Sequence, residues 1–189
     1  MIMSFAPQIL YTLFQFLFFG LCSGLDTISI TQPIKDGHGG GDVLVSNGET
    51  FALGFFSTPG KSNYRYVGGQ SNQRHLWIFS IDTQGNLVLL FDNNDQTVLV
   101  WSSNSSSLST QEHSVAQLLD SGNLVLFQND SERVLWQSFD YPTDTMLLDM
   151  KLGLDRRTGL NWFLTSWKSE DDPSTGNYSY RIDPAGSLS

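Results

Sequence analysis

The side chains best suited to chemistry are three histidines, and they lie far apart in the sequence. His38, His75 and His113 each belong to a different polar segment, without the spacing of metal ligands. A zinc site, or a nucleophile activated by a base, needs partners that converge on one place, and the sequence displays none. We interpret the histidines as surface residues.

Three further segments resemble catalytic or ion-binding loops without completing them. The glycine run 37–41 resembles an oxyanion-hole turn, but no Gly-x-Ser-x-Gly motif supplies a nucleophile. The segment 54–62 resembles a phosphate-binding loop, yet five residues separate its glycines where the motif needs four. The Asp- and Asn-rich turn 92–95 lacks the glycine and the distal glutamate of an EF-hand. We therefore predict a protein that is not an enzyme, with no metal centre and no cofactor.

The strongest pattern is a ten-residue segment that occurs twice. Ser80-Ile-Asp-Thr-Gln-Gly-Asn-Leu-Val-Leu89 is matched by Gln117-Leu-Leu-Asp-Ser-Gly-Asn-Leu-Val-Leu126. Each copy continues through an Asn/Asp-rich turn into a strand that contains a tryptophan, Trp101 or Trp136. Such self-similarity indicates pseudo-symmetric β units that bury a shared core. The tryptophans are then expected to fill the core, with a surface platform for sugar stacking as the alternative.

The elements around the repeat are short and predict an all-β fold. Alternating apolar runs are punctuated by Gly, Asn, Asp and Ser, and no helical period follows the first 24 residues. Asn47-Gly48 predicts a hairpin between Val43–Val45 and Phe51–Phe56. We expect a loop over 170–176 and further strands at Tyr64–Val67, Leu152–Asp155, Leu160–Trp167 and Tyr178–Ile182.

The N-terminal segment predicts secretion. Residues 1–24 carry no charge, and the apolar run Ile9–Leu21 is too short to cross a bilayer of roughly 30 Å as a helix. They fit a signal peptide cleaved near Ser23 or Gly24, the alternative being a buried helix. Cys22, the only cysteine, leaves with this peptide, so the mature chain has no disulfide. We expect a secreted, extracellular protein (apoplast or cell surface) with no membrane span in the mature chain.

Charge and sequons agree with this location. The net charge of −9 and scattered basic residues argue against a nucleic-acid partner. Three Asn-x-Ser sequons, at Asn104, Asn129 and Asn177, predict glycosylation on turns that face water.

The repeat, together with Trp136-Gln-Ser-Phe-Asp-Tyr-Pro-Thr-Asp-Thr145, resembles the bulb-type (mannose-binding) lectin domain. More narrowly, it is similar to the ectodomain start of plant S-domain, or G-type lectin, receptor-like kinases and S-locus glycoproteins. Leu25–Ser29, Phe51–Phe56 and Leu164–Ser169 fit the same family. The resemblance implies a β-prism of three four-stranded sheets with pseudo-threefold symmetry and central tryptophans.

The family's sugar site is written Gln-x-Asp-x-Asn-x-Val-x-Tyr on one strand, and this chain matches it in part. The Tyr is replaced by Leu90 in the first copy and by Phe127 in the second. In the second copy Leu119 and Ser121 occupy the Gln and Asp places, unless a bulge shifts in Gln117 and Asp120. The residues that the resemblance assigns to carbohydrate binding are Asp82, Gln84, Asn86, Val88, Gln117, Asp120, Asn123, Val125 and Phe127.

The resemblance also implies a domain plan. Residues 25–150 form the lectin domain, with an internal deletion near 69–79 that leaves one sheet incomplete, and 151–189 begin the following S-domain region, truncated and without a kinase. The implied function is a secreted carbohydrate-recognition module with mannose-type glycans as partners. The alternative is a protein-interaction or decoy module with degenerate sugar sites, associating with itself or with S-domain receptor ectodomains. A partial product that folds poorly is the third reading.

Overall fold

The computed structural model describes residues 25–36, 41–55, 76–93, 95–105, 114–128, 130–170 and 172–183. Several sequence predictions concern residues outside these ranges: the signal peptide at 1–24, the strand at Tyr64–Val67, the sequon at Asn129 and the three histidines.

Each copy of the repeat forms most of a four-stranded antiparallel sheet. The first sheet has the order β2 (Ile34–Lys35), β5 (Leu76–Ile81), β6 (Leu87–Asp92) and β7 (Thr97–Ser102). The second has the order β1 (Thr27–Ile28), β8 (Ser114–Leu118), β9 (Leu124–Gln128) and β10 (Arg133–Gln137). In both, the Leu-Val-Leu strand lies between its predecessor and the tryptophan strand, so the two sheets are built alike.

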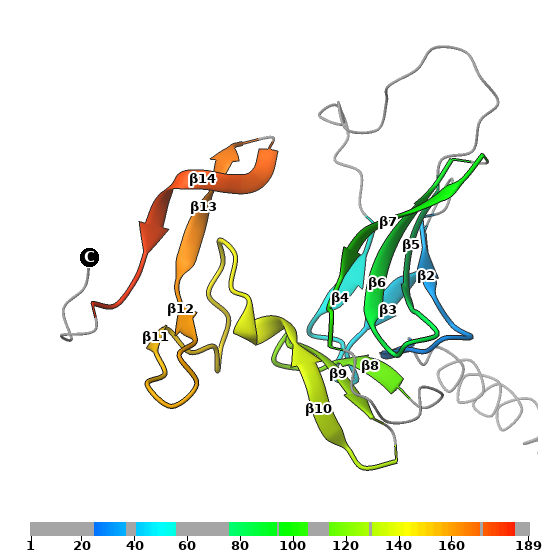
Figure 1. The fold of residues 1–189 in the computed structure, drawn as a ribbon, viewed down its shortest axis with the longest axis horizontal. Coiled ribbons are helices and arrows are strands. Elements are labelled where there is room, and N and C mark those ends of the chain that lie inside the picture. Colours follow the sequence, from blue (N-terminus) through cyan, green and yellow to red (C-terminus); the bar gives the residue numbers. More distant parts are fainter. Residues whose placement is uncertain are drawn as a thin grey trace, which may run out of the picture.

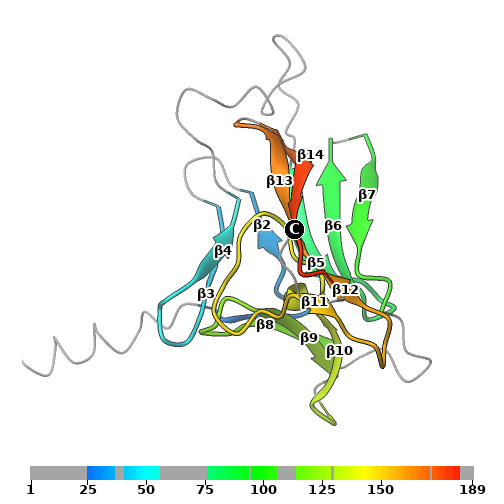
Figure 2. The same ribbon diagram turned by 90° about the vertical axis from the view of Figure 1, so that its left-hand side faces the viewer.

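A third sheet pairs β3 (Val43–Val45) with β4 (Ala52–Gly54), which confirms the predicted hairpin. Within the described ranges this sheet contains only these two strands. In Figure 2 the three sheets form three sides around a common interior. The fold class is therefore all-β, as predicted.

The interior between the sheets is the hydrophobic core. Its buried members come from every sheet because alternate strand residues point inward. They are Ile28, Ile34, Leu44, Ile81, Leu87, Ala116, Leu118, Leu124 and Leu126. One shared core thus joins the two repeats to the smaller third sheet.

The two repeated tryptophans occupy different environments. Trp136 is half-buried and packs against the core, as predicted. Trp101 touches it edge to face, with ring centroids 5.6 Å apart, but is itself 39% exposed. The prediction of a core position is therefore wrong for Trp101, which lies on β7, an edge strand whose neighbours Val98 to Val100 are also exposed.

Two hairpins follow the second repeat and lie to one side of the three sheets (Figure 1). The first pairs β11 (Gly153–Leu154) with β12 (Asn161–Trp162), and the second pairs β13 (Leu164–Ser169) with β14 (Asp172–Tyr180). The predicted loop over 170–176 is wrong, because β14 begins at Asp172. Gly176 makes this pairing feasible, since a Cβ there would overlap the Trp167 carbonyl oxygen.

The corner after Trp136 fastens these hairpins to the sheets. It begins with a short 3-10 helix, η3 (Ser138–Asp140). Further along, the Thr165 N–H donates to the Thr143 carbonyl at 2.8 Å. Partial burial on its own raises the pKa of Asp144, but hydrogen bonds led by that from the Trp167 side chain outweigh it and lower the pKa. Among the described residues, no helix has the length and apolar character to span a membrane.

Candidate functional site

The turns that open the two Leu-Val-Leu strands have the same backbone hydrogen bonds. The Asp82 N–H donates to the Asn86 carbonyl at 2.9 Å, and the Leu119 N–H donates to the Asn123 carbonyl at 2.9 Å. Asp82 therefore corresponds to Leu119, and β8 pairs with β9 without a register shift. No bulge brings other residues into the pattern, so Leu119 and Ser121 hold the Gln and Asp places of the second copy.

In the first copy the polar side chains satisfy one another inside the turn. The Asp82 carboxylate accepts the N–H groups of Gln84 and Asn86, both at 2.8 Å, and the Asn86 side-chain amide at 3.1 Å. Asn86 and Val88 are only 4% and 2% exposed, whereas Gln84 is exposed. The structure thus places Asp82, Gln84 and Asn86 in a closed turn and Val88 within β6, and their role in sugar binding stays a prediction.

In the second copy Asn123 ties its strand to the corner that follows β10. Its side-chain N–H donates to the Gln137 side-chain oxygen at 3.0 Å. Its own side-chain oxygen accepts the Ser138 hydroxyl at 3.0 Å and the Phe139 N–H at 3.2 Å. These bonds hold Gln137 and η3 beside the turn. Asn123 therefore positions side chains that come later in the sequence, at the end of β10 and in η3.

The other predicted residues of this copy connect strands. Gln117 donates to the Asp26 carboxylate at 2.8 Å, and the Asp120 carboxylate accepts the Gly48 N–H at 2.6 Å. Val125 is 8% exposed and Phe127 is half-buried within β9. Asn123 lines the pocket described next, and the sugar-binding role of all these residues remains a prediction.

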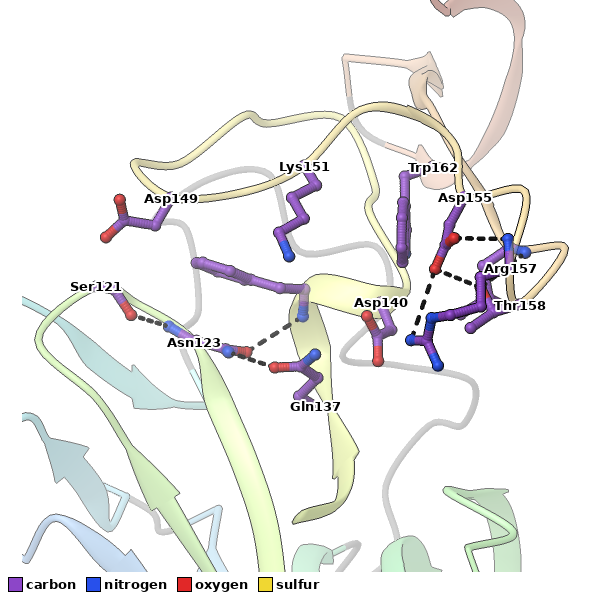
Figure 3. A pocket seen from close by; sticks show the side chains of 12 residues that line it. Ser121, Asn123, Gln137, Asp140, Asp149, Lys151, Asp155, Arg157, Thr158 and Trp162 are labelled. Carbon is purple, nitrogen blue, oxygen red and sulfur yellow. Dashed lines mark hydrogen bonds and ion pairs between the residues drawn. The ribbon is translucent and has the colours of Figure 1, made fainter. Parts of the chain in front are cut away.

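That pocket has a volume of about 400 Å³. One side consists of Ser121, Asn123 and Gln137 from the second repeat. The other side comes from η3 and from the segment that leads into and forms the β11–β12 hairpin, as Figure 3 shows. Its side chains there are Asp140, Asp149, Lys151, Asp155, Arg157 and Trp162, with Phe139, Thr158 and Leu160 completing the lining.

The charged side of the pocket is organised by Asp155. Its carboxylate accepts the Arg157 N–H and the Thr158 hydroxyl, both at 2.8 Å. These two hydrogen bonds, the Arg157 bond first, hold the pKa of Asp155 below its ordinary value. The Gly159 N–H also closes the turn onto the Asp155 carbonyl at 2.8 Å. Asp155 therefore fixes the loop that presents Arg157 and Thr158.

Sequence reasoning missed most of this pocket. Trp162 lies in a predicted strand and Lys151 just before another, and no local signal shows that this segment folds back against the second repeat. The Asn123 side chain fixes the other part of the lining, through bonds to Gln137 and η3 that no strand pattern encodes. In the described part of the chain, no cluster of His, Cys, Asp and Glu could hold a metal ion.

Two of the predicted glycosylation sites can be placed. Asn104 follows β7 with a left-handed backbone (φ 47°), and its side chain is exposed. Asn177 is exposed on β14. Both positions are open to solvent, and their modification stays a prediction.

The structure therefore has two repeated sheets around one core, with a polar pocket where a repeat turn meets the following segment. Comparison with known proteins gives the family. Residues 70–168 match the model of the D-mannose binding lectins, and the chain belongs to this family. The family predicted from the sequence is thereby confirmed.

Similar proteins come from Arabidopsis thaliana and Brassica. The chain is 39% identical to the G-type lectin S-receptor-like serine/threonine-protein kinase RKS1 of Arabidopsis thaliana, over 95% of this chain and 23% of the relative. It is 40% identical to the S-locus-specific glycoprotein BS29-2 of Brassica oleracea var. alboglabra, over 92% of this chain and 43% of the relative. It is 36% identical to S-locus-specific glycoprotein S6 of Brassica oleracea, over 95% of this chain and 44% of the relative. The chain thus spans less than half the length of these relatives.

Proposed function

We propose that the chain is a secreted, non-enzymatic carbohydrate-recognition module of the mannose-binding lectin type, and that it binds a glycan in the pocket beside Asn123. The observation that carries this proposal is the pocket itself, which lies at the turn of the second copy of the family's sugar motif. Its volume of about 400 Å³ falls in the usual range for small-molecule sites.

The chemistry of the lining supports a polyhydroxylated ligand. A hydroxyl group both donates and accepts a hydrogen bond, whereas carboxylates only accept and ammonium or guanidinium groups only donate. The pocket contains both kinds, Asp140, Asp149 and Asp155 as acceptors and Lys151 and Arg157 as donors. Amide and hydroxyl side chains of Asn123, Gln137 and Thr158 can serve either way. Adjacent sugar hydroxyls match such a mixture.

The two copies of the motif have unequal roles in this proposal. Asn86 and Asn123 are both buried and hydrogen-bonded, but the pocket beside Asn123 is lined by the turn of the second copy. We therefore expect one glycan per chain, in the second copy. The lectin domain proposed for 25–150 and the region from 151 onward then share one site, since the pocket has walls from both. The internal deletion near 69–79 remains part of the proposal.

A matched pair of variants tests the site. Ser121 and Gln84 hold the same position in the two turns, but Ser121 lines the pocket. Ser121→Tyr places a ring in the pocket and should weaken glycan binding about tenfold or more by steric conflict. Gln84→Tyr should leave binding unchanged. Binding is measured on a glycan array and by calorimetry, with thermal unfolding of each variant as the check on folding.

The proposal is wrong if the folded wild-type chain binds no glycan, or if the two variants bind equally well. Mannose-type glycans are the first probes because the family is described as D-mannose binding.

The exposed apolar residues of β7 favour a second candidate function, association with another protein. Val98, Leu99 and Val100 are 40%, 56% and 51% exposed on an edge strand, and such strands offer unpaired backbone groups to a partner. Under this alternative the chain is an interaction or decoy module for S-domain receptor ectodomains. Co-precipitation with such an ectodomain should succeed for wild type and fail for Leu99→Lys. Equal capture of both, or of neither, contradicts it.

A further inference from the structure

We infer that the glycan is held mainly by residues that follow the lectin repeats, with Trp162 as the apolar wall and Lys151 and Asp140 as the polar contacts, and that the ligand is a neutral sugar. This inference rests on the proposed function and goes further, because none of these three residues belongs to the repeated sugar motif. It places recognition at the β11–β12 hairpin and at η3.

Trp162 is the larger of the two aromatic side chains that line the pocket, the other being Phe139, and it lies on the side opposite Asn123 in Figure 3. Its ring offers an apolar face, which suits the C–H face of a sugar ring, and a polar N–H at its edge. That N–H is buried and has no hydrogen-bond partner among the described residues. A buried unpaired donor is unfavourable, so a small shift of the ring that lets a ligand oxygen bond to it removes this cost.

Lys151 supplies a cation that the fold does not use. Its side chain forms no ion pair or hydrogen bond with another described residue, and Figure 3 shows its amine pointing toward the middle of the pocket-lining side chains. Asp140 is likewise without a side-chain hydrogen bond to the described part of the chain, and it lies between Gln137 and Arg157 in the same view. Donor and acceptor thus flank the space beside Trp162.

The hairpin holds these groups before any ligand arrives. β12 pairs Trp162 with Gly153, and the Asp155 N–H donates to the Leu160 carbonyl at 2.8 Å. Asp155 also anchors Arg157 and Thr158, as described above. Groups that are already ordered lose little conformational freedom on binding, which favours affinity.

Charge identifies the class of sugar. Three carboxylates and two cations line the pocket, so it carries a small net negative charge. Acidic sugars such as uronates would meet repulsion from Asp140, Asp149 and Asp155. A neutral sugar with adjacent hydroxyls uses both sets of groups without this conflict.

The test compares variants of the full chain in glycan titrations. Trp162→Phe keeps a ring and removes the N–H, and should weaken binding about threefold to tenfold; Trp162→Ala removes the wall and should weaken it further. Lys151→Gln and Asp140→Asn should each weaken it about threefold to tenfold. Trp77→Phe and Lys35→Gln, both on the first sheet, are the controls and should bind as wild type. A uronate should bind more weakly than its neutral counterpart.

The outcomes separate the two claims. If wild type binds and Ser121→Tyr does not, while the Trp162, Lys151 and Asp140 variants bind as wild type, this inference is wrong and the proposed function stands. A uronate that binds better than the neutral sugar overturns the ligand class. If wild type binds no glycan, both the inference and the proposed function fall.

Discussion

Asn86 and Asn123 show how one residue type at equivalent positions takes different roles. Both are buried behind the same turn. The Asn123 side-chain oxygen accepts bonds from Ser138 and Phe139, whereas the Asn86 side-chain oxygen is buried without a partner among the described residues. In the first copy, the Ser103 hydroxyl is hydrogen-bonded to the Ser105 hydroxyl at 2.8 Å and donates no bond to Asn86. The buried asparagine of the second copy is thus more fully hydrogen-bonded than that of the first.

This difference predicts unequal effects of the same substitution. Asn123→Ala leaves the Ser138 hydroxyl and the Phe139 N–H without their acceptor, and should lower the free energy of unfolding by about 2–3 kcal/mol. Asn86→Ala loses the bond to Asp82 but also removes an unsatisfied oxygen, so it should cost about 1 kcal/mol or less. Urea denaturation measures both; an equal or reversed order contradicts the interpretation.

The turn glycines form a second matched pair. Gly85 and Gly122 both have left-handed backbones, with φ of 78° and 84°. A Cβ at Gly122 would lie 2.8 Å from the Phe51 ring and from Leu147, whereas at Gly85 it would meet the flexible Ser114 hydroxyl. Gly122→Ala should therefore cost about 2–4 kcal/mol of stability and Gly85→Ala about 1 kcal/mol. Equal costs in urea denaturation would show that packing at Gly122 is not tight.

At the scale of elements, the β11–β12 hairpin makes the pocket sensitive to acid. The pKa of Asp155 lies below its ordinary value of 3.8 because the folded loop hydrogen-bonds its carboxylate. Its contribution to loop stability is therefore fully present above that ordinary value and is lost as the pH falls through the lowered pKa. The carboxylate is partly exposed and, among the described residues, bonds only within its own loop, so the effect concerns the loop and not global unfolding.

Glycan affinity should accordingly fall as the pH drops below about 3.8. Asp155→Asn replaces the charged carboxylate that accepts the Arg157 and Thr158 bonds. This variant should bind the glycan more weakly at neutral pH, and its affinity should depend less on pH. Titrations between pH 3 and 7, roughly spanning the carboxyl range, provide the measurement. A wild-type profile that rises toward acid pH, or an unchanged profile for Asp155→Asn, is inconsistent with this account.

The same elements show what a sequence can predict. Alternation and repetition located β6 and β9 and the hairpin at Asn47-Gly48, because those strands are half-buried and their turns need particular residues. The extent of β14 escaped prediction, since Glu170–Gly176 has turn-forming residues and its pairing depends on Gly176 passing close to the Trp167 backbone. The pocket escaped for a similar reason: its lining comes from segments far apart in the sequence, and the bonds of Asn123 to Gln137 and η3 are tertiary contacts that no local pattern encodes.

At the scale of the whole molecule, one core serves all three sheets. Leu44, from the two-stranded sheet, is fully buried together with Leu87 and Leu126 of the two repeats. The Asp120 bond to Gly48 adds a polar link between the second repeat and that small sheet. A chain arranged in this way should unfold as a unit, despite the small size of its third sheet.

Leu44→Ala tests this unity. The change leaves a cavity in the shared core and should lower the free energy of unfolding by about 2–5 kcal/mol, within a single transition. Tryptophan fluorescence and far-UV circular dichroism should report the same midpoint in urea. Two separate transitions, or no cooperative transition in the wild-type chain, would support the reading of a partial product that folds poorly.

The central claim is that one neutral glycan binds at the turn of the second repeat, and calorimetric titration with a mannose-type oligosaccharide tests it most directly. We predict one glycan per wild-type chain, unchanged for Gln84→Tyr and lost or weakened about tenfold or more for Ser121→Tyr, which blocks the pocket. Two glycans per chain, or loss of binding in Gln84→Tyr with retention in Ser121→Tyr, would contradict the claim.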